Sequence, residues 1–252
     1  MEEYAIELIE RGKRIDGRNF DEFRKIEIKT NVAGKAEGSA TVKLGETEVI
    51  AGVKMEIAEP FEDTPNEGVL VVNAEFSPLA SPDFESGPPS ENAIELARIV
   101  DRGIRESKAI KMDELVIEAG EKVWGIFIDI HFINHKGNLI DAAALAAITA
   151  LLNTRVPKIV DEKIVRKEFE KKLPVEHQPI TVTVCKLGNK YILDPLLEEE
   201  NVLDAKLSVA VMEDDRICAL QKQGNKGLEF DEIETMLDLA IEKSKEIRKL
   251  IS

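Results

Sequence analysis

Five carboxylates crowd one short stretch of the chain, "DPLLEEENVLDAKLSVAVM" (194–212), just ahead of an apolar run. The acids are Asp194, Glu198, Glu199, Glu200 and Asp204, and Lys206 follows them. Carboxylates at this density could hold a magnesium ion or handle a proton during phosphoryl transfer. A charge run is more often a solvated loop, so the spacing alone leaves both interpretations open.

A second candidate is the stretch "ENAIELARIVDRGIRESKAI" (91–110), which carries three arginines at spacings of four and three residues: Arg98, Arg102 and Arg105. On an α-helix this spacing places the three side chains within roughly a 60° arc of one face. Guanidinium groups on one face can bind successive phosphates. The alternative is ion pairing within the helix. Glu95 has the right spacing to pair with Arg98. Asp101 has the right spacing to pair with Arg105.

The other polar motifs do not indicate a metal or phosphate site. His131 and His135 are four residues apart, but in a strand-like stretch, whereas a metal-binding pair at that spacing needs a helix. The segment "GNKG" (224–227) lacks the lysine-serine pattern of a P-loop. Cys185 and Cys218 lie in apolar runs without metal-ligand spacing. We therefore expect no metal and no cofactor.

The composition is that of an acidic globular protein. The 252 residues are 43% hydrophobic and 33% charged, with a net charge of −15. Such a chain should not bind nucleic acid through bulk electrostatics, so a role with RNA requires a local basic patch or a partner that supplies charge. No apolar run reaches the ~18 residues of a membrane span. The acidic, amphipathic N-terminus is not a signal peptide. We expect a cytoplasmic protein without membrane contacts.

Hydrophobic periodicity predicts strands ahead of helices in both halves of the chain. In the first half we expect strands over 25–32, 38–57 (a hairpin turning at Gly45-Glu46), 69–78 and 121–134, and helices over 2–11, 90–110 and 139–157. Ser90 is the expected N-cap of the second helix, and Pro157 the expected end of the third. The second half should hold four strands between 180 and 224 and a helix from Phe230 onward.

These elements predict an α+β fold made of two related strand-rich halves, with helices packed on the sheets. We expect a single domain over residues 1–252. Its first half covers about 1–155, and its second about 180–252. A charged, proline-containing crossing segment, about 156–179, should connect them.

In order along the chain, the motifs resemble the RNase PH family of phosphorolytic exoribonucleases. The resemblance covers nearly the whole chain. The motifs that show it are "RIDGR" (14–18) followed by Arg24, "GSATVKLGETEVIAGV" (38–53), the arginine helix, the junction near Gly137, the acidic stretch and "EIETMLDLA" (232–240). It implies the two-half fold expected above. It also implies a link to the removal of nucleotides from RNA 3′ ends with inorganic phosphate as the attacking group.

Two departures from the family pattern imply that this chain has lost the chemistry. Active members carry a serine or threonine followed by arginine at the helix start after the glycine. Here Asn138 and Leu139 stand in that region, and Asp141, three residues beyond Asn138, would repel phosphate. Active members also carry two aspartates six residues apart, where this sequence has Glu200 and Lys206. The segments "ENAIELARIVDRGIRES" (91–107) and "GNLIDAAALAAITALLNTRVP" (137–157) are similar to the catalytically silent RNase PH-type subunit of the archaeal exosome.

The resemblance further implies the partners. The active RNase PH-type subunit would alternate with this chain in a hexameric ring, three copies of each, joined by RNA-binding cap proteins and single-stranded RNA. Arg98 and Arg102 would contact the RNA backbone, and Arg105 would face either RNA or an ion pair. Two alternatives stay open. The chain could be an active phosphorolytic 3′-5′ exoribonuclease that uses Glu198, Glu200 or Asp204, or an assembly module that does not touch RNA.

Overall fold

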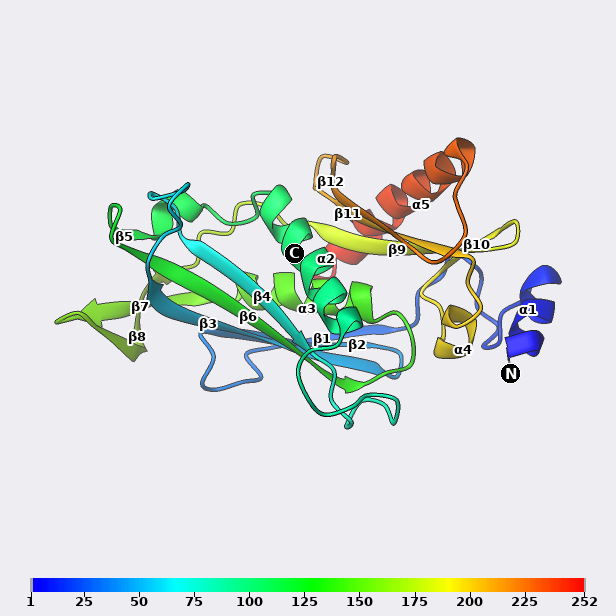
Figure 1. The fold of residues 1–252 in the computed structure, drawn as a ribbon, viewed down its shortest axis with the longest axis horizontal. Helices are drawn as coiled ribbons and strands as arrows, with labels where there is room; N and C mark the ends of the chain where they lie inside the picture. Colours follow the sequence, from blue (N-terminus) through cyan, green and yellow to red (C-terminus); the bar gives the residue numbers. More distant parts are fainter. Residues whose placement is uncertain (1, 252) are drawn as a thin grey trace.

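The computed structural model describes residues 2–251. It contains two main β-sheets that pack on a buried helix (Figure 1). The first sheet is formed by β1 (Ile26–Thr30), β2 (Gly38–Leu44), β3 (Thr47–Ala58), β4 (Val69–Glu75), β5 (Val116–Glu118) and β6 (Lys122–Asn134). Its order is β1-β2-β3-β6-β4, with β5 on β6, and β4 runs parallel to β6.

The second sheet is antiparallel and has the order β10-β9-β11-β12. Its strands are β9 (Ile180–Leu187), β10 (Lys190–Leu193), β11 (Ala205–Val211) and β12 (Ile217–Gln223). The expected α+β class with two strand-rich halves is confirmed.

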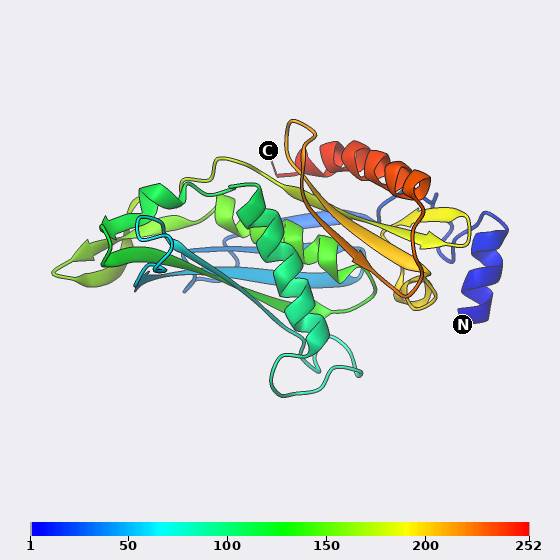
Figure 2. The same cartoon turned by 45° about the horizontal axis from the view of Figure 1, so that its top comes forward.

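Five α-helices and one 3-10 turn are seen within residues 2–251: α1 (Glu2–Glu10), α2 (Glu91–Glu106), η1 (Met112–Leu115), α3 (Leu139–Leu152), α4 (Leu197–Glu200) and α5 (Phe230–Arg248). Helix α2 packs between β4 of the first sheet and β12 of the second, and α5 packs on β9 and β11 (Figure 2). Ser90 caps α2 as expected, because its side chain accepts the Ala93 N–H at 3.3 Å. Within the described chain no helix is long and apolar enough to cross a membrane.

Helix α3 is the shared centre of the core. It contacts β2 and β3 of the first sheet and β9 of the second, and its residues from Leu139 to Leu151 are all buried. The many alanines let the neighbouring strands come close. At Gly38 in β2, an added Cβ would lie 2.5 Å from the Ala150 carbonyl oxygen, so only glycine fits there.

The chain after α3 differs from the prediction. The helix ends at Leu152, so Pro157 does not end it. Pro157 lies instead in β7 (Arg155–Val160), which pairs with β8 (Lys163–Lys172) as a two-stranded hairpin at one end of the molecule (Figure 1). The register shifts on both sides of Pro157, which is how a strand accommodates a residue without an N–H. The expected crossing segment thus contains a hairpin that the proline-rich composition concealed.

Candidate nucleic-acid interface

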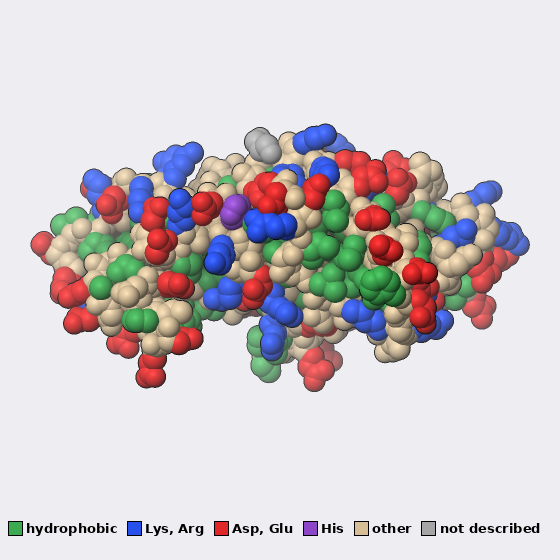
Figure 3. All heavy atoms as spheres, turned by 90° about the horizontal axis from the view of Figure 1, so that it is seen from above, with side chains coloured by type: hydrophobic (Ala, Val, Ile, Leu, Met, Phe, Trp, Pro, Cys, Tyr) green, Lys and Arg blue, Asp and Glu red, His purple; other side chains and the backbone are tan. Residues whose placement is uncertain are grey.

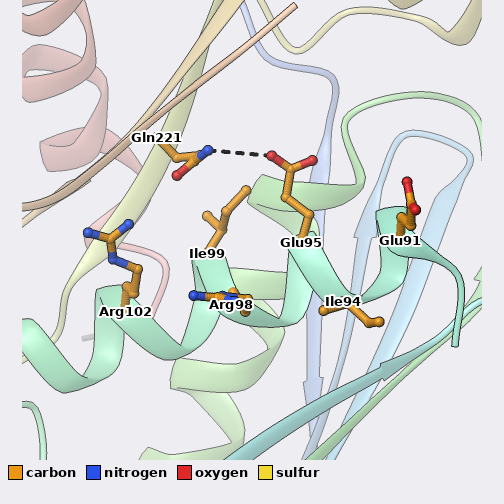
Figure 4. A pocket seen from close by; sticks show the side chains of 7 residues that line it. All are labelled: Glu91, Ile94, Glu95, Arg98, Ile99, Arg102 and Gln221. Atoms are coloured by element: carbon orange, nitrogen blue, oxygen red, sulfur yellow. Dashed lines mark hydrogen bonds between the residues drawn. The ribbon is translucent and has the colours of Figure 1, made fainter.

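Two of the three predicted arginines lie together in an open hollow. Arg98 and Arg102 project from α2 into a hollow of about 390 Å³ that is closed on one side by Gln221 of β12 (Figure 4). The other residues that line it are Glu91, Ile94, Glu95 and Ile99. Both arginine side chains are exposed. The face of α2 that bears them is therefore accessible from outside.

These two guanidinium groups have no partner among residues 2–251. The Glu95 carboxylate, which had the spacing to pair with Arg98, instead accepts a hydrogen bond from Gln221 Nε2 at 3.4 Å (Figure 4). The alternative of a Glu95–Arg98 ion pair is therefore wrong. The reason is the position of β12, which offers Glu95 an amide donor from another element. Arg98 and Arg102 keep their donors available for an external anion.

Arg105 is placed differently. It donates from Nη2 and Nε to the two Asp101 oxygens at 2.7 and 3.1 Å, and from Nη2 to the Leu70 carbonyl at 3.0 Å. The hydrogen bond with Asp101 raises the pKa of Arg105. The arginine lines another hollow, of about 930 Å³, beside η1. The expected pairing with Asp101 is thus present. Figure 3 shows Lys and Arg side chains interspersed with Asp and Glu on the face seen from above.

The first acid of the acidic stretch is a buried structural hub. Asp194 is fully buried and is held by the arginines at the end of and just after "RIDGR". Arg18 Nη1 lies 3.0 Å from Asp194 Oδ2, and Arg24 Nη2 lies 2.6 Å from Oδ1. Arg24 also donates to the carbonyls of Lys136 and Gly137, directly before α3. The motif therefore fixes the start of α3 against the second half of the chain.

Glu199 forms a second buried contact with the same motif. Its Oε2 lies 2.6 Å from Arg14 Nη2, and both side chains are completely buried. Arg14 also donates to the carbonyls of Leu193 and Asp194 at 2.9 and 2.8 Å. Every strong donor direction of this guanidinium is therefore used within the protein, which a buried charge requires.

Three of the four positions that we predicted to be a degenerate active site are joined by hydrogen bonds. The Asn138 N–H donates to Glu200 Oε2 at 2.9 Å, and Lys206 Nζ lies 2.7 Å from Glu200 Oε1. Burial raises the pKa of Glu200, but the charge of Lys206 and its hydrogen bonds outweigh this and leave the pKa below its ordinary value. Leu139 is buried in the core. Asn138, Glu200 and Lys206 thus form one network, and Leu139 offers no polar group to it.

Asp141 points into the protein. Its carboxylate accepts the Thr183 N–H at 3.1 Å, the Thr183 hydroxyl at 2.7 Å and Asn138 Nδ2 at 3.0 Å. Burial raises the pKa of Asp141 to about 6. The Thr183 hydroxyl continues to Ser208 at 2.8 Å, so the network reaches β11. Sequence reasoning missed Thr183 and Ser208, because a threonine or serine in an apolar strand carries no signal of a partner that is distant in sequence.

The two remaining acids, Asp204 and Glu198, lie in different environments. Asp204 pairs with Lys226 at 2.7 Å and accepts the Gly188 N–H at 2.8 Å, and Glu198 is half-buried on α4. In the described part of the chain, no three His, Cys, Asp or Glu side chains are grouped as metal ligands. The density of carboxylates in the sequence does not translate into a shared site, because four of the five acids pair with different basic residues: Asp194, Glu199, Glu200 and Asp204.

Two family models match this chain. The model described as "3′ exoribonuclease family, domain 1" matches residues 22–157, and the model described as "3′ exoribonuclease family, domain 2" matches residues 177–243. Among curated relatives, the exosome complex component Rrp42 of Thermococcus kodakarensis is 49% identical, over 100% of this chain and 94% of the relative. The protein of the same name from Archaeoglobus fulgidus is 52% identical, over 98% of this chain and 94% of the relative.

Solved structures give the same picture. A chain of the "archaeoglobus fulgidus exosome with RNA bound to the active site" superposes with a TM-score of 0.94 at 50% identity, over 100% of this chain and 97% of that one. A chain of an "Archaeal exosome core" gives 0.89 at 47% identity, over 99% and 95%. Because the two family models together match most of the sequence, the chain belongs to the RNase PH family of 3′ exoribonucleases.

Proposed function

We propose that this chain is a non-catalytic subunit of an archaeal exosome core in the cytoplasm. It pairs with an active RNase PH-type subunit in an alternating hexameric ring, three of each, that also carries RNA-binding cap proteins. It shapes the partner's active site and helps to bind single-stranded RNA for 3′-5′ phosphorolytic degradation. The relatives named as exosome components, which match over the full chain, support this assignment.

The absence of catalysis is supported most directly by the network at the start of α3. Phosphorolysis needs donors free to hold inorganic phosphate and a carboxylate free to act on the leaving group. Here the Asn138 N–H and the Lys206 ammonium both bind Glu200, and Leu139 is apolar and buried. Of the acids considered as replacements, Asp204 is paired with Lys226, and Glu200 is bonded to Lys206 and to the Asn138 N–H.

The RNA role is carried by the open arginines. Arg98 and Arg102 share one hollow and have no partner among the described residues, so they can bind backbone phosphates without breaking an internal contact. Phosphate contacts hold no sequence information, so binding should tolerate different sequences and weaken with salt. Arg105 contributes less, because its Nε and Nη2 already donate to Asp101.

Phosphate-dependent shortening of a labelled oligo(A) tests the catalytic part. We expect no product from this chain alone, and nucleoside diphosphates once the active subunit is added. Release of nucleoside diphosphates by this chain alone would support the alternative of an enzyme active in its own right. That result would overturn the non-catalytic assignment.

Charge reversal tests the RNA part. In the assembled ring, Arg98→Glu/Arg102→Glu should weaken RNA binding. It should also make the decrease of log K with log salt, where K is the association constant for RNA, less steep by about 0.7 for each lost phosphate contact. The matched control is Lys163→Glu/Lys172→Glu. It makes the same change in net charge on β8, in the β7–β8 hairpin at one end of the molecule (Figure 1). Equal RNA binding by both double variants, with assembly retained, would favour a subunit that only assembles.

A further inference from the structure

The Glu200 carboxylate binds a backbone N–H at the N-terminus of α3. One oxygen accepts the Asn138 N–H at 2.9 Å, directly before the first residue of α3. The other oxygen accepts from Lys206 Nζ at 2.7 Å. A backbone N–H at a helix N-terminus and an ammonium group are both donors that bind phosphate in proteins. Here both donors bind a side chain of the same protein.

The loop that presents this N–H is held rigidly. At Gly137 the φ angle is +91°, and an added Cβ would lie 2.3 Å from the Pro195 carbonyl oxygen, so the loop abuts the segment that leads to Glu200. Asn138 adopts a left-handed conformation with φ +53°. Its side chain donates to Asp141 at 3.0 Å and to Asp194 at 3.1 Å, which fixes this conformation. The Asn138 N–H therefore keeps pointing at Glu200.

We propose that Glu200 is an internal occupant of the anion position at the start of α3, and that with Lys206 it keeps inorganic phosphate out of this subunit. The inference rests on the proposed function and deepens it. On this proposal the subunit is silent because its anion position is filled, in addition to having lost the hydroxyl and arginine donors of active members.

The surrounding charges make the exclusion effective. Phosphate would have to displace a carboxylate that is tethered within the same chain and already paired with Lys206. It would also approach the carboxylate of Asp141, which accepts a hydrogen bond from Asn138 Nδ2 and has no cationic partner within residues 2–251. A nearby carboxylate charge disfavours a second anion. Removing Glu200 takes away the tethered competitor and frees Lys206, whereas removing a neighbouring acid changes neither donor.

The test is a titration of the full chain with inorganic phosphate, followed through the ¹H–¹⁵N signal of the Asn138 amide. In Glu200→Ala we expect this signal to move with phosphate, and the dissociation constant to be about tenfold or more below that of the unaltered chain. The matched control is Glu198→Ala on the same short helix, which removes the same charge and should behave as the unaltered chain does. In Glu200→Ala/Lys206→Ala the gained response should disappear.

Glu200→Gln provides a second route, because the amide keeps the size of the side chain while removing its charge. We expect a weaker phosphate response in the same direction, with an unchanged circular dichroism spectrum. Absence of an Asn138 response in both the alanine and the glutamine variants, or an equal response in Glu198→Ala, overturns the proposal. This outcome is distinct from failure of the proposed function, which appears as nucleoside diphosphate release by the unaltered chain.

Discussion

The hollow on α2 and the network at the start of α3 are both charge-rich, yet they differ in how their charges are satisfied. In the hollow, Arg98 and Arg102 have no partner within residues 2–251. At the start of α3, the Glu200 carboxylate is bonded on both oxygens. The donors of the second region are used within the protein, whereas those of the first are available. What decides availability is the number of internal partners, rather than the density of charge in the sequence.

The two regions also lie close together. Ser208 of β11 pairs in register with Gln221, which lines the hollow, and Lys206 pairs with Gln223 on the same two strands. Glu95 of the hollow also acts electrostatically on Lys206. On our two proposals, RNA bound by the arginines would lie near the Glu200 network.

The largest expected effect comes from breaking the buried ion pair between Arg14 and Glu199. Arg14→Ala leaves Glu199 buried without a counter-charge, which should lower the free energy of unfolding by about 3–5 kcal/mol. Urea denaturation of the full chain measures it. Arg11→Ala is the control, because its pair with Glu7 is largely exposed and should contribute less than about 1 kcal/mol. Similar losses in the two variants would show that the buried pair is not a structural anchor.

The next effect is a dependence of stability on pH. The pKa of Asp141 is raised from 3.8 to about 6 in the folded protein, so between these values the native state binds more protons than the unfolded state. Stability therefore falls as the pH rises through this window, by about 3 kcal/mol for a shift of this size. Asp141→Asn should remove that fall, because its amide does not ionise and can still bond to Thr183. The difference in unfolding free energy between the two proteins, measured by denaturation from pH 4 to pH 7, checks this; a constant difference would contradict it.

The smallest effect sharpens the comparison within α2. Arg98→Ala and Arg102→Ala should each reduce the salt slope of RNA binding by the assembled ring by about 0.7, whereas Arg105→Ala should leave it nearly unchanged. The reason is that Asp101 holds the Arg105 guanidinium through two hydrogen bonds. Fluorescence anisotropy at several salt concentrations measures the slopes. A slope change for Arg105→Ala as large as for Arg98→Ala would mean that RNA displaces Asp101.

Much of the fold could be predicted, because its signals are local. The strand periodicity, the Ser90 cap and the alanine content of the third helix all depend on residues near one another in the sequence, and the structure confirms each. The end of α3 was misplaced, since Pro157 is a strong local signal for ending a helix but fits equally well in an irregular strand. The hairpin around it forms through pairing, which composition does not reveal.

The site could be predicted only in part, because its contacts are long-range. The arginine spacing located the open hollow, but Gln221 of β12 decides that Glu95 leaves Arg98 unpaired. The acidic stretch was recognised, yet the sequence does not show that Asp194 and Glu199 belong to the "RIDGR" arginines. Arg14 and Glu199 are 185 residues apart in the chain. Only the folded chain brings these charges together.

The position of α3 also bears on how the molecule folds. Because this helix is buried by strands of both sheets, neither half has a complete core without the other. We expect the two matched regions to unfold in a single cooperative transition, which would support one domain over residues 1–252. Folding should be slow for a chain of this size, because its core and its buried ion pairs close only after distant segments meet. A fragment that ends before β9 would expose the apolar side of α3 and should aggregate.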